Sequence, residues 1–269
     1  MQQPEIPANV PTDANGAGNT TPAVTVSAVE ACPRYLLQSI SNIDRSIDTP
    51  KWMTDALVQS GLRSHNFLVD VTNYVLMELG QPLHAFDADT IEGDIVVRLA
   101  QPAETITLLN EQTITLTGDE LLIADDKGAL ALAGIMGGQR SSVTDSTTNI
   151  VLESAFFNPL AIAARARRFG LHTDASQRFE RGVDFELPEL ALARAVDLIT
   201  SVTGSQAGQI VKVENIVHLP TRTPITLPIS KVREVIGIEI EPAVMVRILT
   251  QLGFEVEQQA DKLICTPPS

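Results

Sequence analysis

The most informative stretch of the chain is Ile150-Val151-Leu152-Glu153-Ser154-Ala155-Phe156-Phe157, an apolar run that contains a single ionisable residue. A short apolar run predicts a strand, which we expect over Asn149–Ala155. Side chains alternate between the two faces of a strand, so Glu153 shares a face with Val151 and Ala155. The pattern leaves two interpretations open. Glu153 lies at an edge with its carboxylate in water, or it is the polar group of an apolar pocket.

The rest of the pattern predicts an α+β fold with a mixed, β-rich body and packed helices. Further short apolar or alternating runs predict strands at Val24–Ala28, Arg34–Ile40, Ile95–Leu99, Thr105–Leu109, Gln112–Leu116, Leu121–Ala124, Ala129–Ala133 and Gln209–Val217. Capping residues, helical spacing and glycine stops predict helices at Pro50–Gly61, Asp70–Leu79 with Asp70 as N-cap, Asn158–Phe169 and Pro188–Val202. The glycine-rich segment Gly134–Gly138 is expected to be an irregular loop.

Three parts follow from the composition along the chain. Residues 1–22 are rich in Pro, Asn, Gly and Thr, show no apolar period, and are expected to form a disordered linker. Pro220–Pro224 is the expected boundary between a body at 23–219 and a small α/β domain at 220–269. In that domain we expect a strand at Ile225–Ile229, helices at Ser230–Ile236 and Pro242–Leu252, and strands at Phe254–Val256 and Lys262–Cys265. Such a short segment makes a poor independent core, so we interpret it as a truncated domain.

The charge balance argues against a free-standing nucleic-acid-binding protein. The net charge is −14, whereas binding to polyanions depends on Lys and Arg. One region differs, because Arg165, Arg167, Arg168, Arg178 and Arg181 gather within a short segment. No apolar run approaches the roughly 20 residues of a membrane span. Cys32 and Cys265 lie far apart and are expected to be reduced thiols of a cytoplasmic protein.

Four segments carry a resemblance to a known family. They are Asp70–Val75 (DVTNYV) with Gly80–Asp87 (GQPLHAFD), Ala133–Gly138 (AGIMGG), Val151–Phe157 (VLESAFF) and Thr173–Asp184 (TDASQRFERGVD). In this order and spacing they resemble the beta subunit of bacterial phenylalanyl-tRNA synthetases. The resemblance implies an internal fragment that covers the tRNA-editing region and the start of the following domain, which has a helical, DNA-binding-like fold.

The resemblance implies hydrolytic editing, in which mischarged Tyr-tRNA(Phe) is deacylated. A pocket that hydrogen-bonds the tyrosine hydroxyl rejects phenylalanine strongly, because its buried polar groups would otherwise stay unpaired. The family's substrate-binding residues correspond here to Glu153 for the hydroxyl, the backbone N–H of Gly137, Ala175 as a steric wall, and Arg63. Its catalytic polar groups correspond to Thr72, Asn73, His84 and Thr173. The arginine-rich region is where we expect the acceptor end of tRNA(Phe).

The resemblance also sets expectations for cofactors and partners. The whole synthetase pairs this subunit with an alpha subunit in a tetramer of two alpha and two beta subunits, and it uses ATP and Mg²⁺. This fragment would hold no metal or cofactor and would not aminoacylate alone. Two alternatives remain: a non-catalytic tRNA-binding or assembly module, and a metallohydrolase whose candidate ligands are His65, His84, Asp87, Asp89 and His172.

Overall fold

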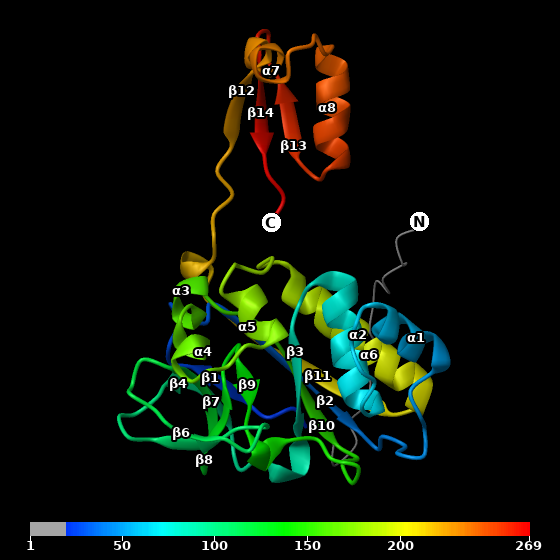
Figure 1. Ribbon diagram of the computed structural model, residues 1–269, viewed down its shortest axis with the longest axis vertical. Helices are drawn as coiled ribbons and strands as arrows, with labels where there is room; N and C mark the ends of the chain where they lie inside the picture. The colour runs from blue at the N-terminus through cyan, green and yellow to red at the C-terminus, as the bar shows by residue number, and fades with distance from the viewer. Residues whose placement is uncertain (1–19) are drawn as a thin grey trace. The chain divides into compact units, whose positions relative to one another are not determined.

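The computed structural model describes residues 20–269, in which the chain forms a first unit that ends at Leu219 and a second unit, Pro220–Ser269 (Figure 1). Residues 1–19 of the expected linker at 1–22 lie outside the described residues. The first unit has the mixed α+β architecture that the sequence predicts.

A four-stranded antiparallel sheet forms the centre of the first unit, in the order β11-β2-β10-β3. Its strands are β2 (Arg34–Ser41), β3 (Leu83–Asp87), β10 (Ile150–Phe156) and β11 (Gln206–Glu214). Every residue of β2 and β10 is buried. Because both faces are covered, alternate residues of the central strands enter two separate hydrophobic clusters.

Helices cover one face of this sheet (Figure 1). They are α1 (Lys51–Gln59), α2 (Phe67–Leu79) and α6 (Leu187–Thr203). Leu36, Ile40 and Leu152 of the sheet pack with helical residues such as Val71 and Ala195 in one cluster. Gly204 ends α6 in a left-handed conformation, as its position after the apolar period predicts.

A second, five-stranded sheet faces the other side, in the order β1-β4-β7-β8-β9. Its strands are β1 (Val24–Val26), β4 (Ile95–Leu99), β7 (Leu121–Asp125), β8 (Gly128–Leu132) and β9 (Met136–Gly137), beside a hairpin of β5 (Thr105–Thr107) and β6 (Thr113–Thr115). The pairing of β1 with β4 is parallel, and the remaining pairings are antiparallel. Tyr35, Leu37 and Val151 of the central sheet pack with Val97 and Leu122 of the second sheet.

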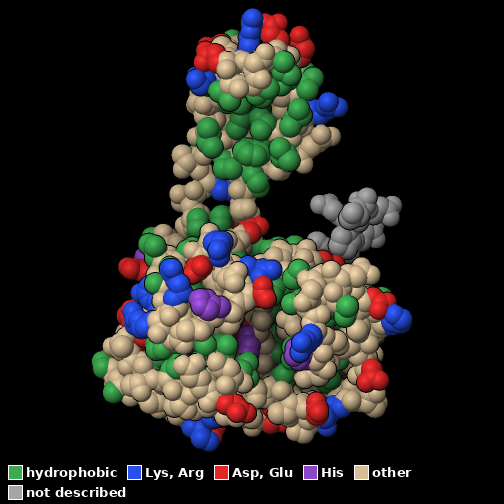
Figure 2. Space-filling model, viewed as in Figure 1, with side chains coloured by type: hydrophobic (Ala, Val, Ile, Leu, Met, Phe, Trp, Pro, Cys, Tyr) green, Lys and Arg blue, Asp and Glu red, His purple; other side chains and the backbone are tan. Residues whose placement is uncertain are grey.

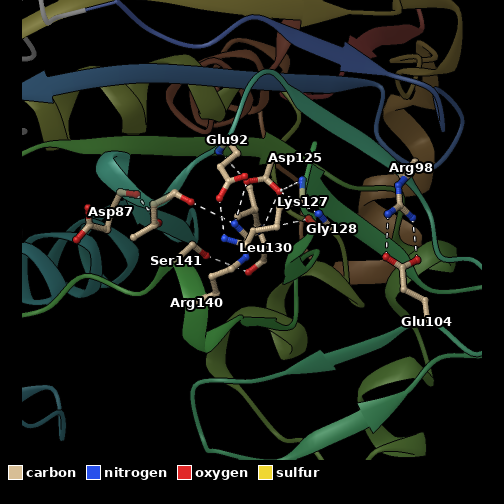
Figure 3. Close-up of polar contacts among 11 residues, drawn as sticks. Asp87, Glu92, Arg98, Glu104, Asp125, Lys127, Gly128, Leu130, Arg140 and Ser141 are labelled. Atoms are coloured by element: carbon tan, nitrogen blue, oxygen red, sulfur yellow. Dashed lines mark hydrogen bonds and ion pairs between the residues drawn. The ribbon is translucent and has the colours of Figure 1, made fainter.

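A buried carboxylate fastens the turn between β7 and β8 (Figure 3). Asp125 accepts two hydrogen bonds from the Arg140 guanidinium, at 3.0 and 2.7 Å. It also accepts from the backbone N–H groups of Glu92, Lys127 and Gly128. Burial alone would raise the pKa of Asp125, but these hydrogen bonds outweigh it and lower the pKa below its usual value.

Short helices connect the central sheet to α6: α3 (Pro159–Ile162), α4 (Arg165–Arg168) and α5 (Asp174–Phe179), with 3₁₀ turns at Ala88–Thr90, Gln139–Ser141 and Ile216–His218 elsewhere. The prediction of one helix over Asn158–Phe169 was wrong. Asn158 does cap α3, but Ala164 takes a φ of +67° and interrupts the helix. The Arg165 side chain donates to the carbonyl oxygens of Leu160 and Ala163, which replaces helical hydrogen bonds.

Two further expectations need correction. The N-cap of α2 is Asn66, whose side chain accepts from Val69 N–H. Asp70 instead lies within the first turn, where it accepts from the hydroxyls of Thr49 and Ser64 and holds the preceding loop. The expected loop at Gly134–Gly138 contains the short strand β9. Strand β3 was not predicted at all.

The second unit is a three-stranded antiparallel sheet with two helices, in the strand order β12-β14-β13. Its elements are β12 (Ile225–Pro228), α7 (Ile229–Ile236), α8 (Pro242–Gln251), β13 (Glu255–Gln258) and β14 (Lys262–Thr266). The fully buried core is small and consists of Met245, Leu263 and Cys265. Both Cys265 and Cys32 are free, buried thiols.

Candidate functional site

The pairing of β3 with β10 places His84 directly opposite Glu153. Directly opposed residues of antiparallel strands point to the same face, with Cβ atoms about 5 Å apart. That face also carries Val151 and Ala155, as the alternation of β10 predicts. The sheet therefore brings together two of the predicted site residues, which lie 69 positions apart in the chain.

These two side chains line a cavity of about 70 Å³ between the central sheet, the second sheet and α5. Its polar or small lining residues include Gly137 and Ala175, so four of the predicted site residues meet here. The apolar lining consists of Pro82, Leu83, Ile123, Ala131, Leu132, Ile135, Met136, Phe157 and Phe179. Figure 2 shows a hollow in the visible face of the first unit, with a histidine side chain at its floor.

Glu153 is the buried acid of this cavity. It is 6% exposed, which excludes the interpretation that its carboxylate lies in water at a strand edge. Its carboxyl group makes no hydrogen bond or ion pair within residues 20–269, and burial raises its pKa to about 8. A buried carboxyl group without a partner is costly, so this position retains an acid at the expense of stability.

His84 is the second titratable group. Its ring contacts Phe86 edge-on, with the centroids 4.5 Å apart. The residue as a whole is partly exposed, but Nε2 is buried and has no hydrogen-bond partner within residues 20–269. Burial lowers the pKa of His84 to about 4, so the imidazole is neutral near pH 7. A neutral imidazole has one donor and one acceptor nitrogen.

Gly137 packs directly on this imidazole. A Cβ atom at position 137 would lie 2.5 Å from Cε1 and 2.8 Å from Nε2 of His84. The neighbouring Gly138 is constrained differently, since its Cβ would lie 2.5 Å from the carbonyl oxygen of Leu130. Glycine at position 137 therefore allows the close approach of backbone to the His84 ring.

Thr173 and Ala175 belong to α5 and its N-terminal cap. The Thr173 hydroxyl donates to the carbonyl oxygen of Ile135 at 2.8 Å and accepts from Ser176 N–H, as the N-cap in a capping box. The single hydroxyl proton of Thr173 is therefore used in the hydrogen bond that joins α5 to the loop before Gly137. Ala175 follows two residues later and forms part of the cavity wall.

The other predicted residues do not line the cavity. Thr72 and Asn73 lie in the second turn of α2, and the Thr72 hydroxyl donates to the carbonyl oxygen of Val69. Arg63 is exposed in the loop between α1 and α2. The structure therefore groups Glu153, His84, Gly137 and Ala175, and leaves these three residues and Thr173 outside the cavity lining.

Sequence reasoning missed Tyr35. Its side chain is fully buried on the strand next to β10, in the hydrophobic cluster that also contains the cavity residues Phe157 and Phe179. The alternation of Tyr35 with Leu37 was visible in the sequence, but only the register of β2 against β10 shows that this face is shared with Glu153.

Most of the predicted basic region is neutralised. Arg168 pairs with Asp119 and Glu120, and Arg178 pairs with Asp174 at 2.8 Å. Arg165 and Arg181 also make ion pairs, to Asp119 and Glu180. Within the described part of the chain, Arg167 alone of the five is exposed and makes no ion pair.

The described residues hold neither a metal-binding cluster nor a membrane-spanning helix. No group of three or more His, Cys, Asp or Glu side chains in residues 20–269 could hold a metal ion. In the same range, no helix is long and apolar enough to cross a bilayer.

Comparisons with known proteins identify both units. Residues 31–204 match the family model of the B3/4 domain, and residues 225–269 match that of the tRNA synthetase B5 domain. The phenylalanine–tRNA ligase beta subunit of Psychrobacter arcticus is 88% identical over 269 residues, which is 100% of this chain and 33% of that subunit. The corresponding subunit of Acinetobacter baylyi is 55% identical, over 86% of this chain and 29% of its own length.

The chain thus spans about a third of the length of the curated relatives that it matches. One solved structure, a fragment of the phenylalanyl-tRNA synthetase beta subunit from Pyrococcus horikoshii, superposes with a TM-score of 0.48 at 16% identity, over 93% of this chain and 70% of that one. The B3/4 model covers more than half of the sequence. The chain therefore belongs to the B3/4 domain family, and it corresponds to a segment of the phenylalanine–tRNA ligase beta subunit.

Proposed function

We propose that the first unit hydrolyses the ester bond of Tyr-tRNA(Phe), and that Glu153 recognises the tyrosine hydroxyl. The observation that carries this proposal is the buried, unpartnered carboxyl group of Glu153 among apolar cavity walls. Phenylalanine in such a cavity would leave this group unpaired, whereas tyrosine would satisfy it. Sites that hydrogen-bond a substrate hydroxyl reject the analogue without it by about 10⁴–10⁵-fold.

The size of the cavity adds a requirement. The cavity volume is about 70 Å³, so its wall residues decide which side chain can enter. Ala175 and Phe179 of α5 and Met136 of β9 are wall residues outside the central sheet. A larger side chain in place of Ala175 would fill the space for the ring.

His84 has a separate role in this proposal. Its neutral imidazole lies opposite Glu153 at the cavity wall, with Nε2 free of a protein partner in the described structure. It can therefore orient a water or a ribose hydroxyl beside the ester by hydrogen bonding. Thr72, Asn73 and Thr173 complete the polar surroundings of the ester in the proposal, with Arg63 near the amino acid or a phosphate.

The similarity to the same relatives also supports a proposal about the larger assembly. We infer that this segment acts in the cytoplasm within a subunit that pairs with an alpha subunit, and that the acceptor end of tRNA(Phe) reaches the cavity. ATP and Mg²⁺ would serve aminoacylation by the complete synthetase. In this proposal, aminoacylation requires the rest of the enzyme.

The test uses the full assembled enzyme in three forms: unmodified, Glu153→Gln and Glu153→Ala. For each form, the hydrolysis rates of Tyr-tRNA(Phe) and Phe-tRNA(Phe) are compared. We expect the tyrosyl ester to be hydrolysed preferentially by the unmodified enzyme. Glu153→Ala should lower its rate about 10–100-fold, because it removes the whole hydrogen bond. Glu153→Gln should lose less, since an amide still bonds a hydroxyl.

Glu30→Gln is the matched control, since Glu30 is exposed and lies outside the cavity lining. Equal hydrolysis of both esters by the unmodified enzyme would refute recognition by Glu153. An enzyme that binds tRNA(Phe) but hydrolyses neither ester would instead support the alternative of a non-catalytic tRNA-binding module.

A further inference from the structure

The hydroxyl group of Tyr35 is a buried donor without a partner. Tyr35 is 0% exposed, and its Oη makes no hydrogen bond within the described residues. Buried tyrosine hydroxyls usually find a partner, because an unpaired one loses its hydration without compensation. Replacement by phenylalanine would suit a purely structural position better, so this hydroxyl requires an explanation.

The register of the central sheet places Tyr35 on the same face as Glu153. On β2 and β10, Leu37 lies opposite Glu153, and Tyr35 lies opposite Ala155. Tyr35 and Glu153 are therefore diagonal neighbours on one face, at a Cβ separation of about 7 Å that long side chains span. Burial, and after it the negative charge of Glu153, raises the pKa of the Tyr35 hydroxyl well above its usual value.

Few other polar groups face the Glu153 carboxyl. His84 approaches from β3. The Cys32 thiol precedes β2 and already donates to the carbonyl oxygen of Arg34. The second sheet and α5 contribute only apolar side chains and glycine backbone to the cavity. Tyr35 is thus a buried donor on this face whose hydroxyl has no partner within the described residues.

We propose that Tyr35 is a positioning residue that donates a hydrogen bond to the Glu153 carboxyl group through one water. One carboxylate oxygen would then be held by Tyr35, and the other would remain free for a substrate hydroxyl. The functional part of this inference rests on the proposed function. The hydrogen bond itself does not, and it can be tested without any substrate.

The first test measures the titration of Glu153 by ¹³C NMR of the side-chain carboxyl, assigned through its loss in Glu153→Gln. A donor to a carboxylate stabilises the ionised form and lowers its pKa, so Tyr35→Phe should raise the Glu153 midpoint, by about one pH unit. The ring is retained, so the core stays filled. The control is Tyr74→Phe, since the Tyr74 hydroxyl also bonds a glutamate, Glu78 at 3.3 Å, but on α2 outside the cavity lining.

An unchanged or lowered Glu153 midpoint in Tyr35→Phe would overturn the proposal. The second test measures hydrolysis of the two esters. We expect Tyr35→Phe to slow hydrolysis of Tyr-tRNA(Phe) about tenfold and to leave that of Phe-tRNA(Phe) unchanged. Equal slowing of both would indicate a structural role only and would overturn the positioning role. If the unmodified enzyme does not prefer the tyrosyl ester, the proposed function fails while the NMR result still decides the hydrogen bond.

Discussion

Glu153 makes the stability of the first unit depend on pH in an unusual direction. The pKa of this carboxyl group is about 8 in the folded protein, against about 4.3 in an unfolded chain. The folded state therefore binds a proton that the unfolded state releases between these two values. Stability from this group is fully present below about pH 4.3 and is lost as the pH rises toward about 8.

The direction of this pH dependence gives a prediction for Glu153→Gln, which has no titratable group at position 153. The free energy of unfolding of the unmodified chain, relative to this variant, should fall by about 1.4 kcal/mol per pH unit between about pH 5 and 7. Urea unfolding of both proteins at several pH values measures this difference in free energy. The other titratable groups contribute equally in both proteins and therefore cancel. A difference that is independent of pH would contradict the raised pKa.

Two adjacent glycines offer a second test at the residue scale. Gly137→Ala should displace the His84 ring, because the added methyl group would lie 2.5 Å from Cε1. We expect hydrolysis of Tyr-tRNA(Phe) to fall at least tenfold with a smaller loss of stability, of about 1 kcal/mol, since a side chain can rotate away.

Gly138→Ala provides the comparison, because its methyl group would meet the backbone oxygen of Leu130 at 2.5 Å. That atom cannot move without the strand, so the loss should be mainly in stability, about 2–3 kcal/mol. Thermal unfolding and initial hydrolysis rates separate the two effects. Similar behaviour of both variants would show that Gly137 has no special relation to His84.

At the scale of elements, the Asp125 contacts hold the β7–β8 turn to the segment before β4. The Asp125 side chain is inaccessible to solvent, and Arg140, its partner, is largely buried. Figure 3 shows the carboxylate at the centre of these contacts, with Arg140 and the backbone N–H groups around it. Such an arrangement is sensitive to loss of one member, because the remaining charge stays buried and unpaired.

Asp125→Asn should therefore lower the free energy of unfolding by about 3 kcal/mol at pH 7. Its folded pKa is lowered, so this stability is present above an unfolded value of about 3.9 and is lost as the pH falls below it. Chemical denaturation at pH 7 and pH 3 checks both points. The control is Asp126→Asn at the next, exposed position, and an equal effect of both variants would argue against the buried ion pair.

At the scale of the whole molecule, charge limits how this chain can engage a nucleic acid. The net charge is −14, and four of the five arginines in the basic region are already paired with carboxylates. Binding to phosphates would require these pairs to break or to be shared. We therefore expect other parts of the synthetase to supply most of the affinity for tRNA.

The prediction is a shallow salt dependence for the isolated chain. A plot of log K against log salt concentration for tRNA(Phe) should have a slope of about −1 to −2, which corresponds to one or two phosphate contacts. Arg167→Ala should reduce the slope by about one unit, and Lys51→Ala, on α1, should leave it unchanged. A slope of about −6 or steeper, measured by fluorescence anisotropy, would refute this view.

The sequence by itself determined the local elements wherever the hydrophobic period agrees with the capping residues and glycine stops. The apolar run at Ile150–Phe156 forms β10, and α6 ends at Gly204, because burial alternates with the backbone period and glycine accepts the left-handed turn. The motif segments indicated Glu153, His84, Gly137 and Ala175, and the alternation of β10 gave the correct face for Glu153. Roles assigned to these residues stay predictions.

Only the tertiary structure decided how these segments meet. Strand β3 carries a short, mixed sequence after Pro82 with no clear period, and it is a strand because β10 supplies its hydrogen-bonding partner. The same pairing places His84 opposite Glu153, and the register of β2 places Tyr35 beside it. Asp70 acts as an anchor within its helix because Thr49, before α1, and His65, before α2, donate hydrogen bonds to it. Such contacts depend on strand order and register, which local propensity does not encode.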